Sequence, residues 1–460
     1  MNLELILQEL DKSQKYAEMR LFELLRFKSI STNSKYRSDC FKAAEWLVKQ
    51  LSEIGFSASI RRTAGNPMVV AHSDDGANSD LLFYGHYDVQ PVDPEALWLT
   101  EPFEPVIQNT NDGPVIRCRG AADDKGQLMT FVEACRAIQT VERKLPCKIS
   151  ILFEGEEETS SPSLIPFLKK HAEELKSNHA LVCDTGMWDA KTPSITNSLR
   201  GMLSEEITIQ GPKKDLHSGL FGGAVPNPLT IMSKLISGLH TANGKVNIPN
   251  FYEGVEKTTV AVLEQWEKLN FSETDFLEKL GLSNSAGESG FSVLEKLWNR
   301  PTCEINGLWG GYIDEGFKTV IPSKAHAKIS FRLVGQQDPE KIRKEFRKKL
   351  RKEIPSDFNI TFSNHQGSKA THFSLDSKIM VAANEALTNE WGKEAVFVGG
   401  GGSIPIVKHF KEILGMETLL VGFSLDDDQI HSPNEKYNLT SFHKGARSWV
   451  RILNKLSTLF

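Results

Sequence analysis

The sequence has little of what marks specialised protein classes. Only six of its 460 residues are cysteine and no two form a C-x-x-C pair, which argues against a zinc knuckle or a disulfide framework. No window approaches the roughly 18 consecutive apolar residues of a membrane-spanning helix. Charge of one sign is also scarce, since 54 basic and 59 acidic side chains leave a net charge of −5. We therefore expect neither a nucleic-acid nor a membrane partner.

The composition and the N-terminal residues are typical of an ordinary soluble protein. Hydrophobic residues make up 40% of the chain and charged residues 25%, which argues against collagen-like and disordered classes. The N-terminal segment carries acids from Glu4 onward and lacks a basic stretch followed by an apolar block, so we expect no signal peptide. A cytoplasmic, reducing location fits these features best.

The length of the chain predicts more than one domain, because a single hydrophobic core seldom organises more than ~250–300 residues. Short apolar runs occur at 67–71, 81–84, 149–153 and 180–183, and helical stretches separate the later ones. This alternation is typical of an α/β domain with a mostly parallel sheet and helices on both faces. A helix and a short strand resume after residue 376.

The middle of the chain has a different pattern. Residues 202–209 and 325–334 largely alternate apolar and polar side chains, which predicts strands with one solvated face. Helical segments cover 226–235 and 339–354, and glutamates interleave the basic residues of the second, so we interpret these as a solvated face. The predicted domains are an inserted α+β domain at 199–371 and, around it, a discontinuous α/β domain at 1–198 and 372–460.

Acidic residues and histidines lie at or near the ends of the predicted strands and helices. They are His86, Asp88, Asp123, Asp124, Glu156, Glu157, Glu158, Asp184, Asp428 and His431. Each alone could be purely structural, as a hydrogen-bonded loop histidine, a solvated turn or a helix N-cap. Together they indicate a ligand site, because acids at the ends of apolar strands are costly to bury unpaired. Histidine and carboxylate side chains suit one or two divalent ions.

Six motifs, in this order, resemble the M20 family of dinuclear metallopeptidases, and within it the carnosinase-like cytosolic dipeptidases. They are GHYDVQP at 85–91, CRGAADDKG at 118–126, EGEEE at 154–158, DLHSG at 215–219, KTVIP at 318–322 and SFRLV at 330–334. The resemblance extends from about residue 15 to residue 455. It implies a catalytic domain that binds two metal ions, interrupted by a lid domain that also forms a homodimer.

The resemblance implies which residues hold the metal ions. One ion would be bound by His86 and Asp184, the other by Glu158 and His431, and Asp123 would bridge the two. The expected ions are zinc, with manganese or cobalt as alternatives, because such mixed ligand sets accept several divalent metals.

Two further residues receive roles beside the ions. Asp88 would fix the orientation of the His86 imidazole, and Glu157 would act as the general base. The glutamate register depends on the alignment, because Glu156, Glu157 and Glu158 are consecutive. A shift by one residue, with Glu156 and Glu157 in place of Glu157 and Glu158, stays open.

The resemblance also implies the residues that bind the substrate. Arg332 would receive a free C-terminal carboxylate, a bidentate task for which arginine is suited. His217 would stabilise the oxyanion in the active site of the other subunit of a homodimer. Further substrate-binding residues are Thr319, which is also offered across the dimer, His365, Gly402 and Ser403. The chain departs from these relatives at Gly399 and Gly400, where they carry an Arg-Glu pair, so the side-chain preference cannot be transferred.

These residues together predict hydrolysis of dipeptides or short peptides with a free C-terminal carboxylate, through a hydroxide that bridges two metal ions. The alternative is an N-acyl amino acid amidohydrolase that uses the same site, although the motifs at 318–322 and 331–334 favour the peptide. A third hypothesis is a dimeric binding protein that has lost its chemistry. The intact set of ligand residues argues against it.

Overall fold

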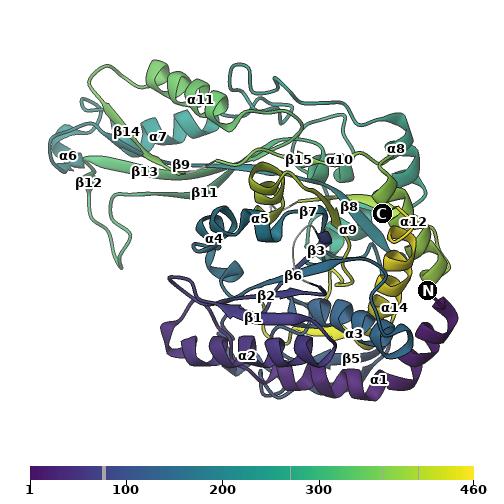
Figure 1. Cartoon of the computed structure of the whole chain (residues 1–460). Helices are drawn as coiled ribbons and strands as arrows, with labels where there is room; N and C mark the ends of the chain where they lie inside the picture. The colour runs from purple at the N-terminus through teal and green to yellow at the C-terminus, as the bar shows by residue number, and fades with distance from the viewer. Residues whose placement is uncertain (75–78, 270, 366, 402–403, 460) are drawn as a thin grey trace. The chain divides into compact units, whose positions relative to one another are not determined.

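The computed structural model describes residues 1–74, 79–269, 271–365, 367–401 and 404–459 (Figure 1). The chain forms two compact units. The first unit comprises Met1–Asn197, Phe373–Val398 and Ile404–Phe460, and the second comprises Ser198–His372 and Gly399–Ser403. Among the described helices, none combines the length and the apolar character that crossing a membrane requires.

The first unit is built on a mixed sheet with a parallel centre. In spatial order its strands are β1 (Ser57–Arg61), β2 (Met68–His72), β6 (Ile149–Glu154), β3 (Ser79–His86), β7 (Ser177–Val182), β17 (Glu417–Leu420) and β8 (Ser194–Leu199), and β16 (Val396–Gly400) pairs with β8. The last two residues of β8 belong to the second unit, where they pair with β15 (Thr371–His372). Neighbouring strands from β6 to β17 are parallel, whereas β1, β2 and β8 pair antiparallel. The predicted α/β class with a mostly parallel sheet is therefore confirmed.

Helices cover both faces of this sheet. They are α1 (Leu3–Leu25), α2 (Arg37–Glu53), α3 (Lys125–Glu142), α4 (Leu164–Lys170), α5 (Ala172–Leu175), α12 (Lys378–Trp391), α13 (Pro405–His409) and α14 (Leu439–Leu456). Successive residues of a strand point to opposite faces. Phe83 accordingly stacks on Phe131 of α3, with ring centroids 3.8 Å apart, while Tyr84 packs edge-on against Phe410, which directly follows α13.

Trp449 of α14 occupies the centre of the aromatic core. It is fully buried and meets the rings of Phe83 and Phe131 edge-on at 5.6 Å and 5.5 Å. Its indole N–H donates a hydrogen bond to Thr130 Oγ1 at 3.0 Å. The C-terminal helix is thus fixed to both the sheet and α3 by one side chain that leaves no polar atom unsatisfied.

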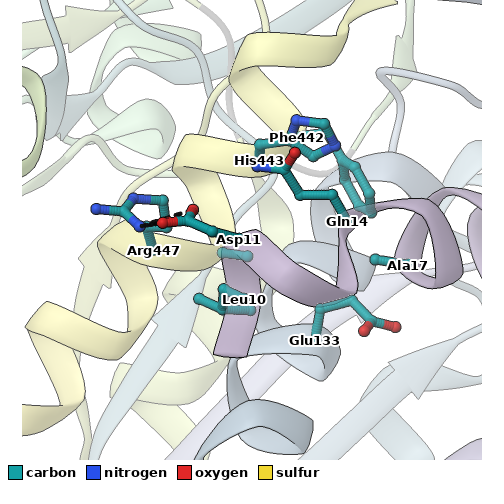
Figure 2. A pocket seen from close by; sticks show the side chains of 9 residues that line it. Leu10, Asp11, Gln14, Ala17, Glu133, Phe442, His443 and Arg447 are labelled. Atoms are coloured by element: carbon teal, nitrogen blue, oxygen red, sulfur yellow. Dashed lines mark hydrogen bonds and ion pairs between the residues drawn. The ribbon is translucent and has the colours of Figure 1, made fainter. Parts of the chain in front are cut away.

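The N-terminal and C-terminal helices of this unit pack on each other (Figure 2). Leu10 and Ala17 of α1 and Phe442 of α14 line a cavity of only about 10 Å³, which is the size of one water molecule. Arg447 of α14 donates at 2.9 Å to both carboxylate oxygens of Asp11 at its rim. The cavity is a packing detail and is too small for a ligand.

A small sheet that sequence analysis did not predict completes the first unit. It consists of β4 (Val106–Thr110), β5 (Gly113–Arg117) and β18 (Lys436–Asn438), in the order β18-β5-β4. Every residue of β4 is exposed, so this strand carries no buried apolar pattern. The pairing of Lys436 with Arg117 brings the segment after His431 beside the segment before Asp123.

The second unit has an antiparallel sheet with one helix-covered face. The sheet order is β11 (Thr302–Gly310), β13 (Lys324–Leu333), β9 (Gly201–Gln210) and β14 (Asn359–Asn364), and a separate pair joins β10 (Leu216–His217) to β12 (Val320–Ile321). Its helices are α6 (Ser218–Phe221), α7 (Pro228–Ser237), α8 (Val260–Glu267), α9 (Glu273–Lys279), α10 (Val293–Trp298) and α11 (Pro339–Glu353). Burial alternates strictly along β9, as predicted from its sequence.

One acid interrupts the apolar face of β9 and is compensated there. Glu205 is almost fully buried and lies between apolar core positions. Arg343 and Arg347 of α11 both donate to its carboxylate, the latter from Nε at 2.8 Å. Two of the basic side chains of α11 therefore pair with a buried acid, in addition to the basic side chains on its solvated face.

Replacing Trp449 with alanine should lower the free energy of unfolding by about 3–5 kcal/mol, because the change leaves a large cavity beside Phe83 and Phe131. Urea unfolding of the full chain, followed by circular dichroism, measures this loss. Trp449→Phe serves as the control and should cost less, since a ring still fills the space. A loss below about 1 kcal/mol for the alanine variant would contradict the proposed importance of this residue.

Candidate metal centre

Three neighbouring parallel strands end at the same edge of the sheet and deliver the acidic motifs there. His86 is the last residue of β3 and is paired with Glu154 at the end of β6. The pairing of Tyr84 with Val182 places Asp184 just beyond the end of β7 on the other side of β3. Carboxyl ends of parallel strands are where open α/β sheets bind ligands, so this edge is the candidate site.

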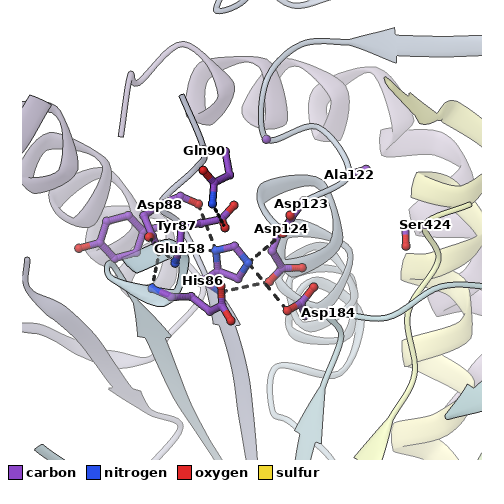
Figure 3. Close-up of polar contacts among 12 residues, drawn as sticks. His86, Tyr87, Asp88, Gln90, Ala122, Asp123, Asp124, Glu158, Asp184 and Ser424 are labelled. Atoms are coloured by element: carbon purple, nitrogen blue, oxygen red, sulfur yellow. Dashed lines mark hydrogen bonds and ion pairs between the residues drawn. The ribbon is translucent and has the colours of Figure 1, made fainter. Parts of the chain in front are cut away.

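His86, Asp123 and Asp184 form the first group of metal-ligating atoms (Figure 3). His86 is fully buried, and its Nε2 lies 3.0 Å from Asp123 Oδ1 and 4.0 Å from Asp184 Oδ2. One ligand atom from each of the three residues falls within 4.8 Å of the others. A single cation could contact all three.

Asp123, Glu158 and His431 form the second group. His431 Nε2 lies 2.9 Å from Asp123 Oδ2 and 3.3 Å from Glu158 Oε2. Asp123 thus presents one oxygen to each group. His431 has a φ of 64°, in the left-handed region that a residue other than glycine adopts at a cost of about 1 kcal/mol or more. The backbone here is held in the conformation that directs the imidazole toward Asp123.

The glutamate register, left open by the sequence, has a clear geometric basis. Glu158 reaches His431, whereas Glu156 Oε1 accepts a hydrogen bond from the backbone N–H of Asn66 at 2.9 Å. The Glu156 side chain also fills the space beside Gly65, where an added Cβ would lie 1.4 Å from Oε1. The structure therefore brings Glu158 to the ligand cluster and turns Glu156 toward Asn66, while Glu157, which would be the ligand in the shifted register, is in neither group.

Asp88 contacts both the histidine and the glutamate turn. Its backbone carbonyl lies 3.1 Å from His86 Nδ1, and its carboxylate Oδ1 lies 3.5 Å from the same nitrogen. The two carboxylate oxygens accept hydrogen bonds from the backbone N–H groups of Glu157 and Glu158 at 3.2 Å and 3.1 Å. Asp88 thus orients the imidazole mainly through its carbonyl and uses its carboxylate to hold the glutamate turn.

Asp124 supports the cluster from behind. Its Oδ2 accepts a hydrogen bond from the backbone N–H of His86 at 3.0 Å, and Cys183 Sγ approaches Oδ1 at 3.6 Å. A Cβ added at Gly85 would lie 2.8 Å from Asp124 Oδ2, so the motif requires glycine before His86. Burial raises the pKa of Asp124 to about 8.

The charges of the cluster act strongly on one another. Burial by itself would raise the pKa of Asp123, but hydrogen bonds with His431 and His86 outweigh it and lower that pKa below its usual range. Burial raises the pKa of Asp184 well above its usual range, and the charge of Asp123 adds to the increase. Hydrogen bonds with Asp123 and Glu158 raise the pKa of His431 to about 10. Divalent cations would stabilise these carboxylates in their ionised form.

The donor set fits such cations. Each group combines one imidazole nitrogen with carboxylate oxygens, a mixture that suits zinc, manganese or cobalt. Glu158 Oε1 is buried and has no hydrogen-bond partner among the described residues, so a polar atom beside the second group is left to be satisfied. Buried carboxylate oxygens without partners are costly, and a bound ion removes that cost.

Glu157 lies next to both groups and belongs to neither. Within the described residues its carboxylate forms no hydrogen bond or ion pair, although its backbone is held by Asp88. Burial raises the pKa of Glu157 to about 8, with the charges of Asp184 and Glu158 adding to the increase while His86 opposes it. A free carboxylate with this pKa can exchange a proton with a nearby water.

The other residues predicted to act on the substrate belong to the second unit. His217 is the last residue of β10 and is exposed, and Thr319 accepts a hydrogen bond at its carbonyl from Ser218 N. Arg332 is half-buried on β13 between Met202 and Thr302 of the flanking strands. The structure also exposes His365. Gly402 and Ser403 lie outside the described residues.

The first glycine of the run, Gly399, has a local structural cause in the second unit. A Cβ added at Gly399 would lie 2.5 Å from Trp298 Cβ, so the tryptophan occupies the space that a side chain at this position needs. Arg200, which sequence analysis did not single out, donates from Nε to the carbonyl of Gly401 at 3.0 Å. Burial, and next the charge of Arg332, lower the pKa of Arg200 to about 10, so two arginines lie near each other here.

Sequence analysis also missed a buried acid that contacts the Asp123 loop. Glu435 is fully buried, and its carboxylate accepts hydrogen bonds from the backbone N–H groups of Gly120, Ala122 and Asp123. Nothing in the local sequence distinguishes it from a solvated acid, because it lies between Asn434 and Lys436. Its position four residues after His431 was the only available signal.

Comparison with known proteins identifies relatives over almost the whole chain. The sequence pattern described as Peptidase family M20/M25/M40 matches residues 82–455. The chain is 29% identical to the Cys-Gly metallodipeptidase dug1 of Schizosaccharomyces pombe, covering 100% of this chain and 99% of that protein. It is 27% identical to the Beta-Ala-His dipeptidase of Homo sapiens, covering 85% and 78%. The solved structure of the di-peptidase Dug1p from Saccharomyces cerevisiae matches with a TM-score of 0.80 and 28% identity over 99% of each chain.

Replacing Glu158 with glutamine should reduce the number of divalent ions bound per chain, because it removes a charged ligand atom beside His431 and Asp123. Glu156→Gln is the matched control from the same turn and should keep the metal content of the unmutated protein, since Glu156 is engaged with Asn66. Elemental analysis after dialysis against zinc measures both. Metal lost from Glu157→Gln and kept by Glu158→Gln would instead support the register shifted by one residue.

Proposed function

The chain belongs to peptidase family M20/M25/M40, as its motifs predicted, and we propose that it is a metallodipeptidase that hydrolyses dipeptides and short peptides with a free C-terminal carboxylate. The observation that carries this proposal is the pair of ligand groups that share Asp123. The names of the curated relatives support the reaction, since they are a Cys-Gly metallodipeptidase and a Beta-Ala-His dipeptidase. These two substrates differ in both residues, so the side-chain preference of this chain is not transferred from them.

We propose that the two groups hold two divalent ions, with zinc expected and manganese or cobalt as alternatives. His86 and Asp184 would bind one ion, Glu158 and His431 the other, and Asp123 both. When bound, two ions supply Lewis-acid activation of a water molecule and of the scissile carbonyl. The remaining steps fall to the side chains of this protein.

Glu157 is the proposed general base. It is close enough to Asp184 and Glu158 for their charges to raise its pKa, and its carboxylate has no hydrogen-bond partner among the described residues. It can therefore accept a proton from the attacking water and then pass that proton to the departing amine. The carboxylate of Asp88 accepts a hydrogen bond from the backbone N–H of Glu157 and so holds Glu157 in place.

His217 is the proposed donor to the oxyanion of the tetrahedral intermediate. Its Nδ1 accepts a hydrogen bond from Gly219 N at 3.0 Å, so the neutral ring carries its proton on Nε2. The ring is therefore prepared as a donor at the nitrogen that points away from its own loop. A donor to the oxyanion contributes about 10²–10³ in rate in other hydrolases.

We propose a homodimer in which His217 acts in the active site of the other subunit, as the resemblance implies. Large apolar side chains near His217 and in the segment before β12 are exposed, which supports a covered surface there. Ile313 is 82% exposed, Phe317 is fully exposed, and Leu220 and Phe221 directly follow the His217 loop. Thr319 belongs to the same surface, because its carbonyl is bonded to Ser218 N.

Arg332 is the proposed receptor for the C-terminal carboxylate of the substrate. Among the described residues no acid forms an ion pair with it, so its guanidinium is free for a bidentate partner. His365 is a further candidate on the same unit, as are Gly402 and Ser403 by their position in the sequence. The first unit would then be the metal-binding catalytic domain and the second the lid and dimerisation domain of a cytoplasmic enzyme.

The full chain, loaded separately with zinc and with manganese, should hydrolyse dipeptides that have free amino and carboxyl ends. Glu157→Gln should keep the metal content and lower kcat about 10²–10⁴-fold, because only the proton acceptor is removed. Chromatography of the released products measures kcat, and elemental analysis measures the metal content. A fully active Glu157 variant would refute the assigned role.

The same assay separates the dipeptidase from the amidohydrolase that the sequence left as an alternative. Each dipeptide is compared with its N-acetylated counterpart at equal concentration. Faster turnover of the free dipeptide supports the proposal, whereas faster turnover of the N-acetylated compound would establish the deacylase. Absence of turnover for both, with metal bound, would favour the silent binding protein.

Mixing two inactive variants tests the exchange of His217 across a dimer. Glu157→Gln and His217→Ala chains should each be inactive, and after subunit exchange their mixture should regain about one quarter of the unmutated activity. The reason is that about half of the dimers are mixed and each mixed dimer has one site with both residues intact. Native mass spectrometry confirms that mixed dimers have formed. An inactive mixture that contains them would place His217 outside the partner's site.

A further inference from the structure

Glu435 connects the two loops that supply Asp123 and His431, and nothing in the proposed reaction uses it. Its Oε1 accepts hydrogen bonds from the backbone N–H groups of Ala122 and Asp123 at 2.9 Å and 3.1 Å. Its Oε2 accepts from Gly120 N and from Arg119 Nη1, both at 2.8 Å. All four donors thus come from one segment of five residues that ends at the shared aspartate.

Arg119 extends this connection to two other segments. Its Nη2 donates to the carbonyls of Pro91 and Ser432 at 3.0 Å and 3.2 Å, and its side chain is almost fully buried. Pro91 lies five residues after His86 in the same motif, and Ser432 directly follows His431. The buried Arg119–Glu435 pair therefore contacts the chain beside three of the proposed ligands: His86, Asp123 and His431.

The backbone of residues 118–123 has little conformational freedom. Gly120 has a φ of 79°, in the left-handed region, and a Cβ there would lie 2.6 Å from Val89 Cγ1. The carbonyl of Glu435 accepts a hydrogen bond from Cys118 N at 3.1 Å, so the backbone of Glu435 is fixed to the same segment as its carboxylate. These contacts set the direction of the Asp123 backbone, and the backbone in turn sets where the Asp123 side chain begins.

Building on the metal centre proposed above, we infer that Glu435 is a positioning residue that aims the two oxygens of Asp123 at the two ions. Asp123 must present Oδ1 on the His86 side and Oδ2 on the His431 side, a placement that tolerates little rotation. Glu435 belongs to the loop that carries His431, and its carboxylate accepts a hydrogen bond from the backbone N–H of Asp123. The loop of one proposed ligand, His431, thus sets the backbone position of another, Asp123. Buried residues that orient metal ligands in this manner change metal affinity when they are altered.

A carboxylate is required at this position because all four partners are donors. Glutamine offers one oxygen and one NH₂ group, so either the Arg119 and Gly120 donors or the Ala122 and Asp123 donors would face another donor. Glu435→Gln changes one atom of the side chain and should keep the overall packing. Its effect on metal binding therefore reports on the hydrogen bonds to the loop.

The experiment measures zinc affinity of the full chain by competition with a chelator, and the visible spectrum of the cobalt-loaded protein. Glu435→Gln should weaken zinc binding about 10–100-fold and alter the cobalt spectrum, since the position of Asp123 in the coordination sphere changes. Arg119→Lys, which keeps a cation beside Glu435 and loses the bonds to Pro91 and Ser432, should weaken zinc binding less. If the glutamine variant does not fold, unchanged zinc affinity of the lysine variant overturns the inference.

Glu133→Gln is the matched control, because Glu133 is also buried and accepts two hydrogen bonds from an arginine, Arg20, at 2.8 Å and 2.6 Å. It should lower the thermal midpoint of the protein and leave zinc affinity within about twofold, as expected for a distant site. Equal weakening by Glu133→Gln, or unchanged zinc affinity of Glu435→Gln, overturns the inference and leaves the proposed function intact. Failure of the unmutated protein to bind any divalent ion overturns both.

Discussion

The structure of the candidate site depends on the position of one carboxylate, that of Asp123. Asp123 is the residue that the two ligand groups share, with its Oδ1 3.0 Å from His86 Nε2 and its Oδ2 2.9 Å from His431 Nε2. Asp184 and Glu158 then complete one group each. A displacement of Asp123 would alter both groups together, so contacts with the surrounding chain must hold this residue in place.

Buried acids that ligate nothing provide this support, and they do so in one recurring way. Asp88 accepts the backbone N–H groups of Glu157 and Glu158, Asp124 accepts that of His86, and Glu435 accepts that of Asp123. Each carboxylate belongs to a segment other than the one it holds. Backbone donors are satisfied and the ligand side chains remain available for ions.

Charge is distributed differently in the two units. Carboxylates are concentrated at the sheet edge of the first unit, where cations fit them, whereas the second unit presents Arg200 and Arg332. In the proposed reaction the carboxylates of the first unit would hold the ions that polarise a carbonyl, and Arg332 of the second unit would receive a terminal carboxylate. Trp298 occupies the space that a side chain at Gly399 would need, so an arginine at this first position of the Arg-Glu pair does not fit beside it.

The sequence alone determined the class of fold through its apolar runs, and it determined the family through the resemblance of its six motifs. It also indicated residues that could act together, because several apolar strands that end in acids are costly to bury unless the acids share a ligand. It predicted the strands that deliver His86 and Asp184, since buried parallel strands are continuous apolar runs. Only the tertiary structure distinguished the surroundings of Glu156 from those of Glu158, because Glu156 accepts a hydrogen bond from Asn66, 90 residues away along the chain, whereas Glu158 reaches His431. Only the tertiary structure showed Glu435 and the exposed strand β4, since a buried acid and a solvated one look alike in sequence, and burial is set by long-range packing.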